Sequence, residues 1–312
     1  VFAFGDASNH CGNAGGYAGT ARGAQIWGQP DETVDDVTVE KGCNVYNLKK
    51  VQGSRYVGGY IGNLCSGSAA EVSTEVSEDG SELQDLLDSI VQSGDNGLLS
   101  AASAIVSTVR YAKITVADSE WGFTVGGWDE TVTENEETTT VHILPLSAGG
   151  FVGTMEGAVI GNYNRTVSVT PGQNGEDDEY SLIGENLTQT NIYVNDLRGV
   201  EAQYYAGGFV GIANVGGAAS IGGSGTSLLS LAQLGEASVL DIFKPYIYNS
   251  NVEGVSDGFY IYTRGEQTSG VLCSTRCSGC AGGFAGAPLD ATGENNAGKE
   301  GKQGPAVEVG GG

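Results

Sequence analysis

The chain has 312 residues, including 52 glycines and only 6 prolines, and it lacks a Gly-X-Y period, which excludes collagen. Its 39% of apolar residues, with 14 Tyr and 8 Phe, exclude a disordered chain. The 38 acidic residues against 14 basic ones give a net charge of −24, which repels nucleic acid and anionic membranes. The composition therefore predicts an ordered, turn-rich β protein that binds no nucleic acid.

One phrase occurs five times: a small or apolar residue, two glycines, an aromatic residue, an apolar residue and a glycine. A phrase that returns through a whole chain indicates a repeat architecture. Its irregular spacing favours a solenoid with insertions over a propeller, whose blades have nearly constant length. The predicted repeat scaffold consists of the central glycine and the aromatic residue of each copy: Gly16, Tyr17, Gly59, Tyr60, Gly150, Phe151, Gly208, Phe209, Gly283 and Phe284.

Residues 1–76 carry the first two copies. The segment Val45-Tyr46-Asn47-Leu48 precedes copy two, and the similar segment 192–197 precedes copy four. The predicted unit is therefore a strand, a turn, the phrase, a second turn and a short apolar strand. We expect the phrase glycines to permit positive φ at corners and close approach of neighbouring backbones. The aromatic residue and the apolar residue after it should point to opposite faces, and successive aromatic side chains should stack.

Two insertions interrupt the repeats. The apolar residues of 77–110 follow helical spacing from Leu83 onward, with Ser81 as N-cap, and predict a helical hairpin that covers the main body. A leucine-rich stretch predicts a second, short helical insertion at 224–243. Between them, 130–141 is expected to form an exposed acidic hairpin. The Gly-rich residues 290–312 predict a flexible tail. The chain starts at Val1 and stops at Gly312 as if cut from something longer, and it has no apolar run long enough to span a bilayer.

The six cysteines are predicted to form disulfides, because their number is even and the protein otherwise resembles an extracellular one. A bridge between Cys43 and Cys65 would join adjacent repeats. Zinc binding by the densest cluster is a minority alternative, because neither His10 nor His142 adjoins it. The disulfide candidates are Cys11, Cys43, Cys65, Cys273, Cys277 and Cys280.

Other candidate sites are weaker. Two acidic loops, 31–36 and 176–179, supply oxygen ligands for Ca²⁺ but match no calcium-binding motif, so we expect solvated loops and no cofactor. Asn164 and Asn186 begin Asn-x-Thr sequons and are candidates for glycosylation. With two histidines there is no Ser/His/Asp set, and no rule selects a catalytic pair from the many carboxylates. No catalytic residue is predicted.

One copy of the phrase, Gly149-Gly150-Phe151-Val152-Gly153 with the following segment 159–162 (Val-Ile-Gly-Asn), resembles the GLUG-type repeats of large bacterial surface proteins and adhesins. The resemblance covers about a third of the chain. It implies a right-handed β-solenoid on an exported protein that acts as a stalk, adhesin or matrix component. The insertions and the cysteines depart from the family pattern.

The sequence therefore predicts an all-β fold, a right-handed parallel β-helix over residues 1–312 with helical insertions. We expect a non-enzymatic, extracellular or cell-surface structural or adhesive protein that self-associates into a fibre or a larger surface assembly, with a host or matrix ligand as a further partner. The alternatives are a carbohydrate-active β-helix enzyme and a glycan- or protein-binding module that uses Trp121, Phe123 and Trp128.

Overall fold

The computed structural model describes residues 1–3, 12–67, 106–134, 137–161, 163–170, 179–186, 191–214, 244–265, 280–289 and 308–310. These residues contain strands and turns and no helix, and most of the paired strands run parallel. The prediction of an all-β fold is confirmed for this part of the chain.

Three parallel sheets have five strands each. Sheet B consists of β2 (Ala14–Gly15), β8 (Tyr56–Gly58), β15 (Ser147–Gly149), β21 (Tyr205–Gly207) and β26 (Cys280–Gly282). Sheet C consists of β3 (Ala18–Arg22), β9 (Ile61–Cys65), β16 (Val152–Glu156), β22 (Val210–Asn214) and β27 (Ala285–Leu289). Sheet D consists of β4 (Gln25–Trp27), β10 (Thr108–Arg110), β17 (Val159–Ile160), β23 (Tyr246–Tyr248) and β28 (Glu308–Gly310).

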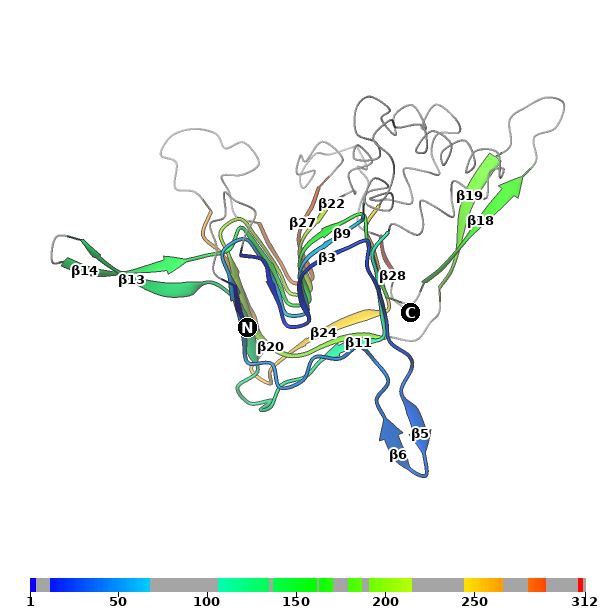
Figure 1. Cartoon of the computed structure of the whole chain (residues 1–312), viewed down its shortest axis with the longest axis horizontal. Coiled ribbons are helices and arrows are strands. Elements are labelled where there is room, and N and C mark those ends of the chain that lie inside the picture. Colours follow the sequence, from blue (N-terminus) through cyan, green and yellow to red (C-terminus); the bar gives the residue numbers. More distant parts are fainter. Residues whose placement is uncertain are drawn as a thin grey trace, which may run out of the picture.

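The fourth parallel sheet, sheet A, has seven strands. It consists of β1 (Phe2–Ala3), β7 (Lys50–Gly53), β11 (Ala112–Ile114), β12 (Phe123–Gly126), β20 (Ile192–Ala202), β24 (Ser250–Gly254) and β25 (Tyr260–Thr263). The first half of β20 pairs with β11 and β24, and its second half pairs with β12 and β25. In sheets B, C and D each strand pairs with the equivalent strand of the next repeat, so the strands stack one behind another in chain order (Figure 1).

The repeated phrase lies where sheets B and C meet. In each copy the small residue and the first glycine end a sheet B strand, and a sheet C strand starts just after the aromatic residue. The aromatic rings stack in a single row, Tyr17 on Tyr60, then Phe151, Phe209 and Phe284. Their centroids are 4.7–4.9 Å apart, which is the spacing of neighbouring strands. The predicted aromatic ladder is therefore confirmed.

The second glycine of the phrase is needed for close approach of backbones. A Cβ on Gly59, Gly150 or Gly208 would lie 2.0 Å from the carbonyl oxygen of the equivalent glycine in the next repeat. None of the phrase glycines has positive φ, so that part of the prediction was wrong. The expected alternation was also wrong, because Phe151 and Val152 are both fully buried. The chain turns a corner between sheets B and C at this point, and both side chains reach the interior.

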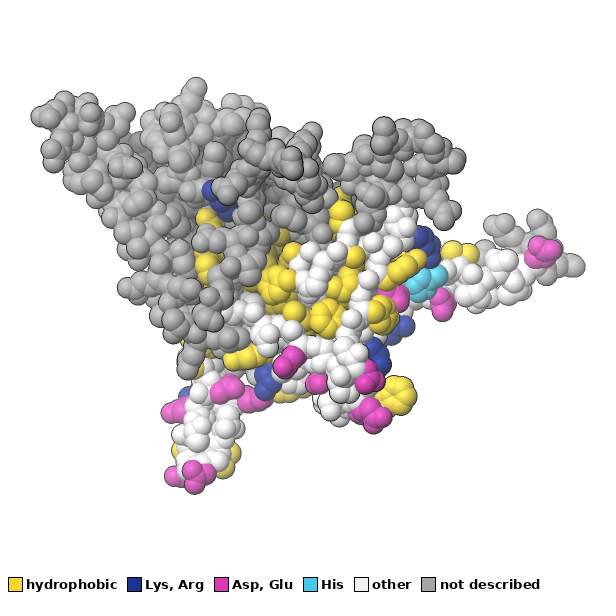
Figure 2. Space-filling view, turned by 180° about the vertical axis from the view of Figure 1, so that it is seen from behind, with side chains coloured by type: hydrophobic (Ala, Val, Ile, Leu, Met, Phe, Trp, Pro, Cys, Tyr) yellow, Lys and Arg dark blue, Asp and Glu magenta, His cyan; other side chains and the backbone are white. Residues whose placement is uncertain are grey.

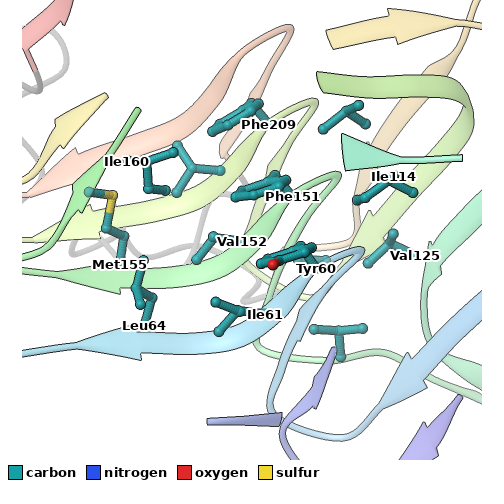
Figure 3. Close-up of a cluster of buried hydrophobic side chains, with 14 of the residues drawn as sticks. Tyr60, Ile61, Leu64, Ile114, Val125, Phe151, Val152, Met155, Ile160 and Phe209 are labelled. Carbon is teal, nitrogen blue, oxygen red and sulfur yellow. The ribbon is translucent and has the colours of Figure 1, made fainter. Parts of the chain in front are cut away.

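The hydrophobic core lies in the interior enclosed by the parallel sheets, where the aromatic row packs against sheet A. Tyr60, Phe151 and Phe209 face residues of sheet A such as Ile114 and Val125, all of them fully or almost fully buried (Figure 3). The predicted match of the segments before copies two and four is confirmed, since Val45 and Val194 both pair with Ile114. Asn47 and Asp196, two residues later in each segment, both adopt left-handed φ.

Three antiparallel hairpins project from the stacked strands in different directions (Figure 1). They are β5 (Glu32–Val34) with β6 (Val37–Val39), β13 (Trp128–Glu134) with β14 (Glu137–Ile143), and β18 (Tyr163–Thr170) with β19 (Glu179–Asn186). The second confirms the predicted acidic hairpin at 130–141. The first turns through Asp35 and Asp36, both at positive φ, as a two-residue hairpin turn of type I′ requires.

Two predicted boundaries were wrong. Thr108–Arg110 form β10, so the helical hairpin expected at 77–110 extends too far, because Val109 lies at helical spacing from Val106 and equally suits the buried position of a short strand. Glu308–Gly310 form β28 and pair with β23, so the tail expected to be flexible throughout contributes a strand to sheet D. The rest of the first insertion up to residue 105, the insertion at 224–243 and residues 290–307 lie outside the described residues. The described part contains no helix with the length and hydropathy needed to cross a membrane.

Candidate functional site

A polar groove of about 720 Å³ runs along the outer face of sheet A. One wall is formed by outward-facing residues of β11, β20 and β24, and the other by the segments that lead into and out of hairpin β5–β6. The lining comprises Gln29, Pro30, Asp31, Gly42, Asn44, Tyr111, Ala112, Lys113, Asn191, Tyr193, Asn195, Asn251 and Glu253. We call this feature the sheet A groove.

The strand register of sheet A places residues from distant parts of the sequence side by side in one wall of the groove. Lys113 pairs with Tyr193, and Tyr193 pairs with Asn251, so the three residues form one row across β11, β20 and β24. Along β20, Ile192 and Val194 are fully buried, which turns Tyr193 and Asn195 outward by the two-residue period of a strand. The same strands therefore supply the core on one face and the groove on the other.

The single lysine of the groove is engaged by a carboxylate. Lys113 Nζ lies 2.7 Å from Glu40 Oε1, and Tyr46 donates a hydrogen bond of 2.6 Å to Glu40 Oε2. Asn44 in turn donates to the Tyr46 hydroxyl. The bond from Lys113 is the main reason that the pKa of Glu40 is lowered. Because Glu40 balances Lys113, the carboxylates of Asp31 and Glu253 leave the groove with negative charge.

Asn191 is the polar residue of the groove that is most deeply buried, at 4% exposure. Its backbone is satisfied, since its N–H donates to Asn249 O and its carbonyl accepts from Ala112 N, both at 3.0 Å. Its side-chain Oδ1 and Nδ2 have no hydrogen-bond partner in the part of the chain that the structure describes. Burying an amide group without a hydrogen-bond partner lowers the stability of the fold by about 1–3 kcal/mol for each unsatisfied group. A ligand in the groove that hydrogen-bonds to Asn191 would offset this cost.

A second polar cluster surrounds His142 at the base of hairpin β13–β14. Its Nδ1 lies 2.6 Å from Asp129 Oδ1 and its Nε2 lies 3.2 Å from Glu201 Oε2. Tyr260 donates to the other Glu201 oxygen at 2.9 Å, and burial, followed by this bond, raises the pKa of Tyr260 to about 12. The hairpin is one of the arms that project from the stacked strands (Figure 1).

The His142 cluster connects hairpin β13–β14 to strands β20 and β25. Asp129 and His142 are opposite each other in the hairpin, Glu201 belongs to β20 and Tyr260 to β25. No serine, threonine or cysteine of the described residues is hydrogen-bonded to the imidazole of His142, whose two nitrogens face the carboxylates of Asp129 and Glu201. Its contacts attach the hairpin to sheet A.

The aromatic residues that the sequence offered as a binding platform do not form one. Phe123 is fully buried in the core, and Trp128 packs edge-on against Phe2 at 5.2 Å. Trp121 is 69% exposed, and its backbone carbonyl accepts a bond from Arg198. Three aromatic residues within eight positions of the sequence thus have three different environments.

The Cys43–Cys65 bridge expected from the sequence is not formed. Cys65 ends β9 in sheet C, with its Sγ 3.8 Å from Ala21 O, whereas Cys43 follows hairpin β5–β6 and its N–H donates to Tyr111 O. Neither cysteine, nor Cys280, is bonded to another described cysteine. Cys11, Cys273 and Cys277 lie outside the described residues, so pairings that involve them stay predictions.

The remaining candidates have these places. Asn164 lies in β18 and Asn186 ends β19, so both sequons begin near the base of one projecting hairpin. The segment 31–36, expected to be an acidic loop, contains strand β5 and the turn of hairpin β5–β6, and Glu32 of β5 pairs with Lys41. Among the described residues, no group of three or more His, Cys, Asp or Glu side chains is arranged to hold a metal ion. Residues 176–178 of the other acidic loop are not described.

The residues of the sheet A groove were missed by the sequence reasoning. Tyr193, Asn195, Asn251 and Glu253 match no motif, and the one available signal was their alternation with apolar residues, which marks an outward face. Comparisons of the chain with protein-family models, with curated proteins and with solved structures find no match. The resemblance to GLUG-type repeats therefore stays a prediction.

Proposed function

We propose that the chain is a right-handed β-solenoid segment of an extracellular structural or adhesive protein, and that it functions by assembly and binding without catalysing a reaction. The observation that carries the proposal is the single aromatic row through equivalent strands of all five copies. A stack of this kind builds a long, stiff body whose surface can vary by insertion. The acidic composition is compatible with an extracellular location.

The two ends of the stack support self-association. In the described part of the chain, β3 and β27 each pair on one side only, at opposite edges of sheet C. The ring of Tyr17, at the first end, is 49% exposed, and a Cβ on Gly283, at the last end, would meet no atom within 4 Å. Figure 2 shows hydrophobic side chains gathered in the middle of one face. Unpaired strand edges with apolar ends favour stacking between chains.

Sedimentation velocity and negative-stain electron microscopy over a range of protein concentrations test this proposal. We expect concentration-dependent, end-to-end assembly that strengthens as salt screens the net charge of −24. Tyr17→Glu should weaken assembly, because it places a charge on the exposed end of the row. Trp121→Glu, a change at an exposed residue outside the row, is the matched control. A monodisperse monomer at every concentration, without fibres, would contradict the assembly proposal.

Glycan binding is a second candidate function, favoured by the polar lining of the sheet A groove. It is compatible with an adhesive surface protein. Release of reducing ends from any oligosaccharide incubated with the protein would instead favour the carbohydrate-active enzyme and overturn the non-enzymatic part of the proposal.

A further inference from the structure

We propose that the sheet A groove is a binding site for a neutral oligosaccharide. The inference rests on the adhesive part of the proposed function and gives it a place on the molecule and a ligand class. Four properties carry it: the size of the groove, the chemistry of its lining, its charge, and the buried amide of Asn191.

The size and the lining suit a ligand rich in hydroxyl groups. A volume of about 720 Å³ lies in the range of small-molecule sites. The amides of Gln29, Asn44, Asn195 and Asn251 each offer a donor and an acceptor, as hydroxyl groups do in return. An apolar ligand would leave these groups without partners, at a cost in free energy.

The charge of the groove selects against anions. Asp31 and Glu253 contribute negative charge, and the ammonium of Lys113 is already bonded to Glu40. A carboxylated or sulfated sugar would meet this charge in addition to that of the whole chain. Tyr193, in the middle of the row formed with Lys113 and Asn251, offers an aromatic ring beside amide groups, a combination that contacts both the C–H face and the hydroxyl groups of a sugar.

Asn191 is the independent sign of a ligand. Its exposure is only 4%, and it lines the groove. Its Oδ1 and Nδ2 have no hydrogen-bond partner among the described residues. One sugar hydroxyl supplies both an acceptor for Nδ2 and a donor for Oδ1. Burial of an amide without partners is unfavourable for folding alone, and in this proposal the bound sugar supplies the missing partners of Asn191.

The test is a titration of the full chain with neutral hexasaccharides of β-1,4-glucose, α-1,4-glucose and β-1,4-mannose, followed by calorimetry and saturation-transfer NMR. The anionic galacturonic acid hexamer and the cationic glucosamine hexamer are the comparison ligands. We expect at least one neutral hexasaccharide to bind and the anionic hexamer to fail. Binding of none of the neutral probes, or of the cationic hexamer alone, would overturn the inference.

Variants then place the binding site. Tyr193→Ala and Asn251→Ala should each weaken binding by about tenfold or more, the change expected for loss of a central contact. Tyr262→Ala is the matched control, since Tyr262 is an exposed tyrosine of the same sheet, on β25, outside the lining. Equal effects of Tyr193→Ala and Tyr262→Ala on affinity would place the site elsewhere and overturn the assignment.

Asn191→Leu separates a binding role from a structural one. If the amide serves a ligand, the variant should bind the neutral probe at least about tenfold more weakly and have an unchanged or higher melting temperature without ligand. A lower melting temperature with unchanged affinity would show that Asn191 serves the fold and would remove this support. The sedimentation experiment contains no sugar, so failure of assembly and failure of the groove are observed separately.

Discussion

Two rows of residues in the same stack behave very differently. The aromatic row, Tyr17, Tyr60, Phe151, Phe209 and Phe284, keeps one kind of side chain through five repeats. A row at the far end of the sheet C strands has the same register and contains Arg22, Cys65, Glu156, Asn214 and Leu289. The backbone makes equivalent pairs in both. What differs is the neighbour that each side chain meets.

In the aromatic row each ring meets another aromatic ring, with centroids 4.7–4.9 Å apart, on one or both faces. Replacing the ring in one repeat therefore disturbs the packing of the rings on either side, which favours an aromatic residue at this position in every repeat. At the end of the strand no such stack of like side chains is present, and the residue type differs in every repeat. The comparison indicates that the repeat encodes the scaffold, and that specificity lies in residues that do not repeat.

The largest expected effect is the loss of a ring from the middle of the row. Phe151 is fully buried between Tyr60 and Phe209, so Phe151→Ala should lower the free energy of unfolding by about 3–5 kcal/mol. Tyr17 stacks on one neighbour and is 49% exposed, so Tyr17→Ala should cost about 1 kcal/mol. Urea unfolding followed by circular dichroism measures both. Similar losses in the two variants would mean that the row does not act as a continuous stack.

A smaller effect is expected from one added methyl group beside the row. A Cβ on Gly150 would lie 2.0 Å from Gly208 O, so Gly150→Ala must push two backbones apart and should cost about 1–3 kcal/mol or more. Gly283 is the same position of the last copy, and a Cβ there would meet nothing within 4 Å. Gly283→Ala should therefore leave the melting temperature nearly unchanged. A large effect at Gly283 would indicate that the last copy is covered.

The same comparison explains which parts of the structure could be predicted from the sequence. The aromatic row was predictable because the phrase occurs five times, so that equivalent positions can be aligned within the one sequence. The match of Val45 with Val194 was predictable because the segments around them are also similar. The hairpin at 130–141 was predictable because alternation over many residues is local. The orientation of Phe151 and Val152 was not, because a corner between two sheets breaks the two-residue period.

The groove could not be predicted, since its residues become neighbours only through the strand register of sheet A. Lys113, Tyr193 and Asn251 lie far apart in sequence and become neighbours through two strand pairings. Likewise, Asp129, His142, Glu201 and Tyr260 come together because a hairpin folds back beside β20 and β25. No spacing rule contains these distances, and none of the residues belongs to the repeated phrase.

The smallest expected effect concerns Glu156, in the variable row. Burial raises the pKa of this carboxyl group above its ordinary value of 4.5, and Arg22 and Arg55 oppose the rise. A raised pKa in the folded state contributes stability that is present below the unfolded pKa and is lost as pH rises through the folded one. At pH 7 the charged carboxylate therefore disfavours folding, and Glu156→Gln should be more stable than the parent protein, with an advantage that shrinks as the pH falls through the raised pKa of the folded state and is lost below the unfolded value of about 4.5. Thermal unfolding at several pH values measures the change, with Glu130→Gln on the exposed hairpin as the control. A Glu156→Gln variant that is less stable at pH 7 would show that the two arginines outweigh burial, and that even this variable row is held by specific partners.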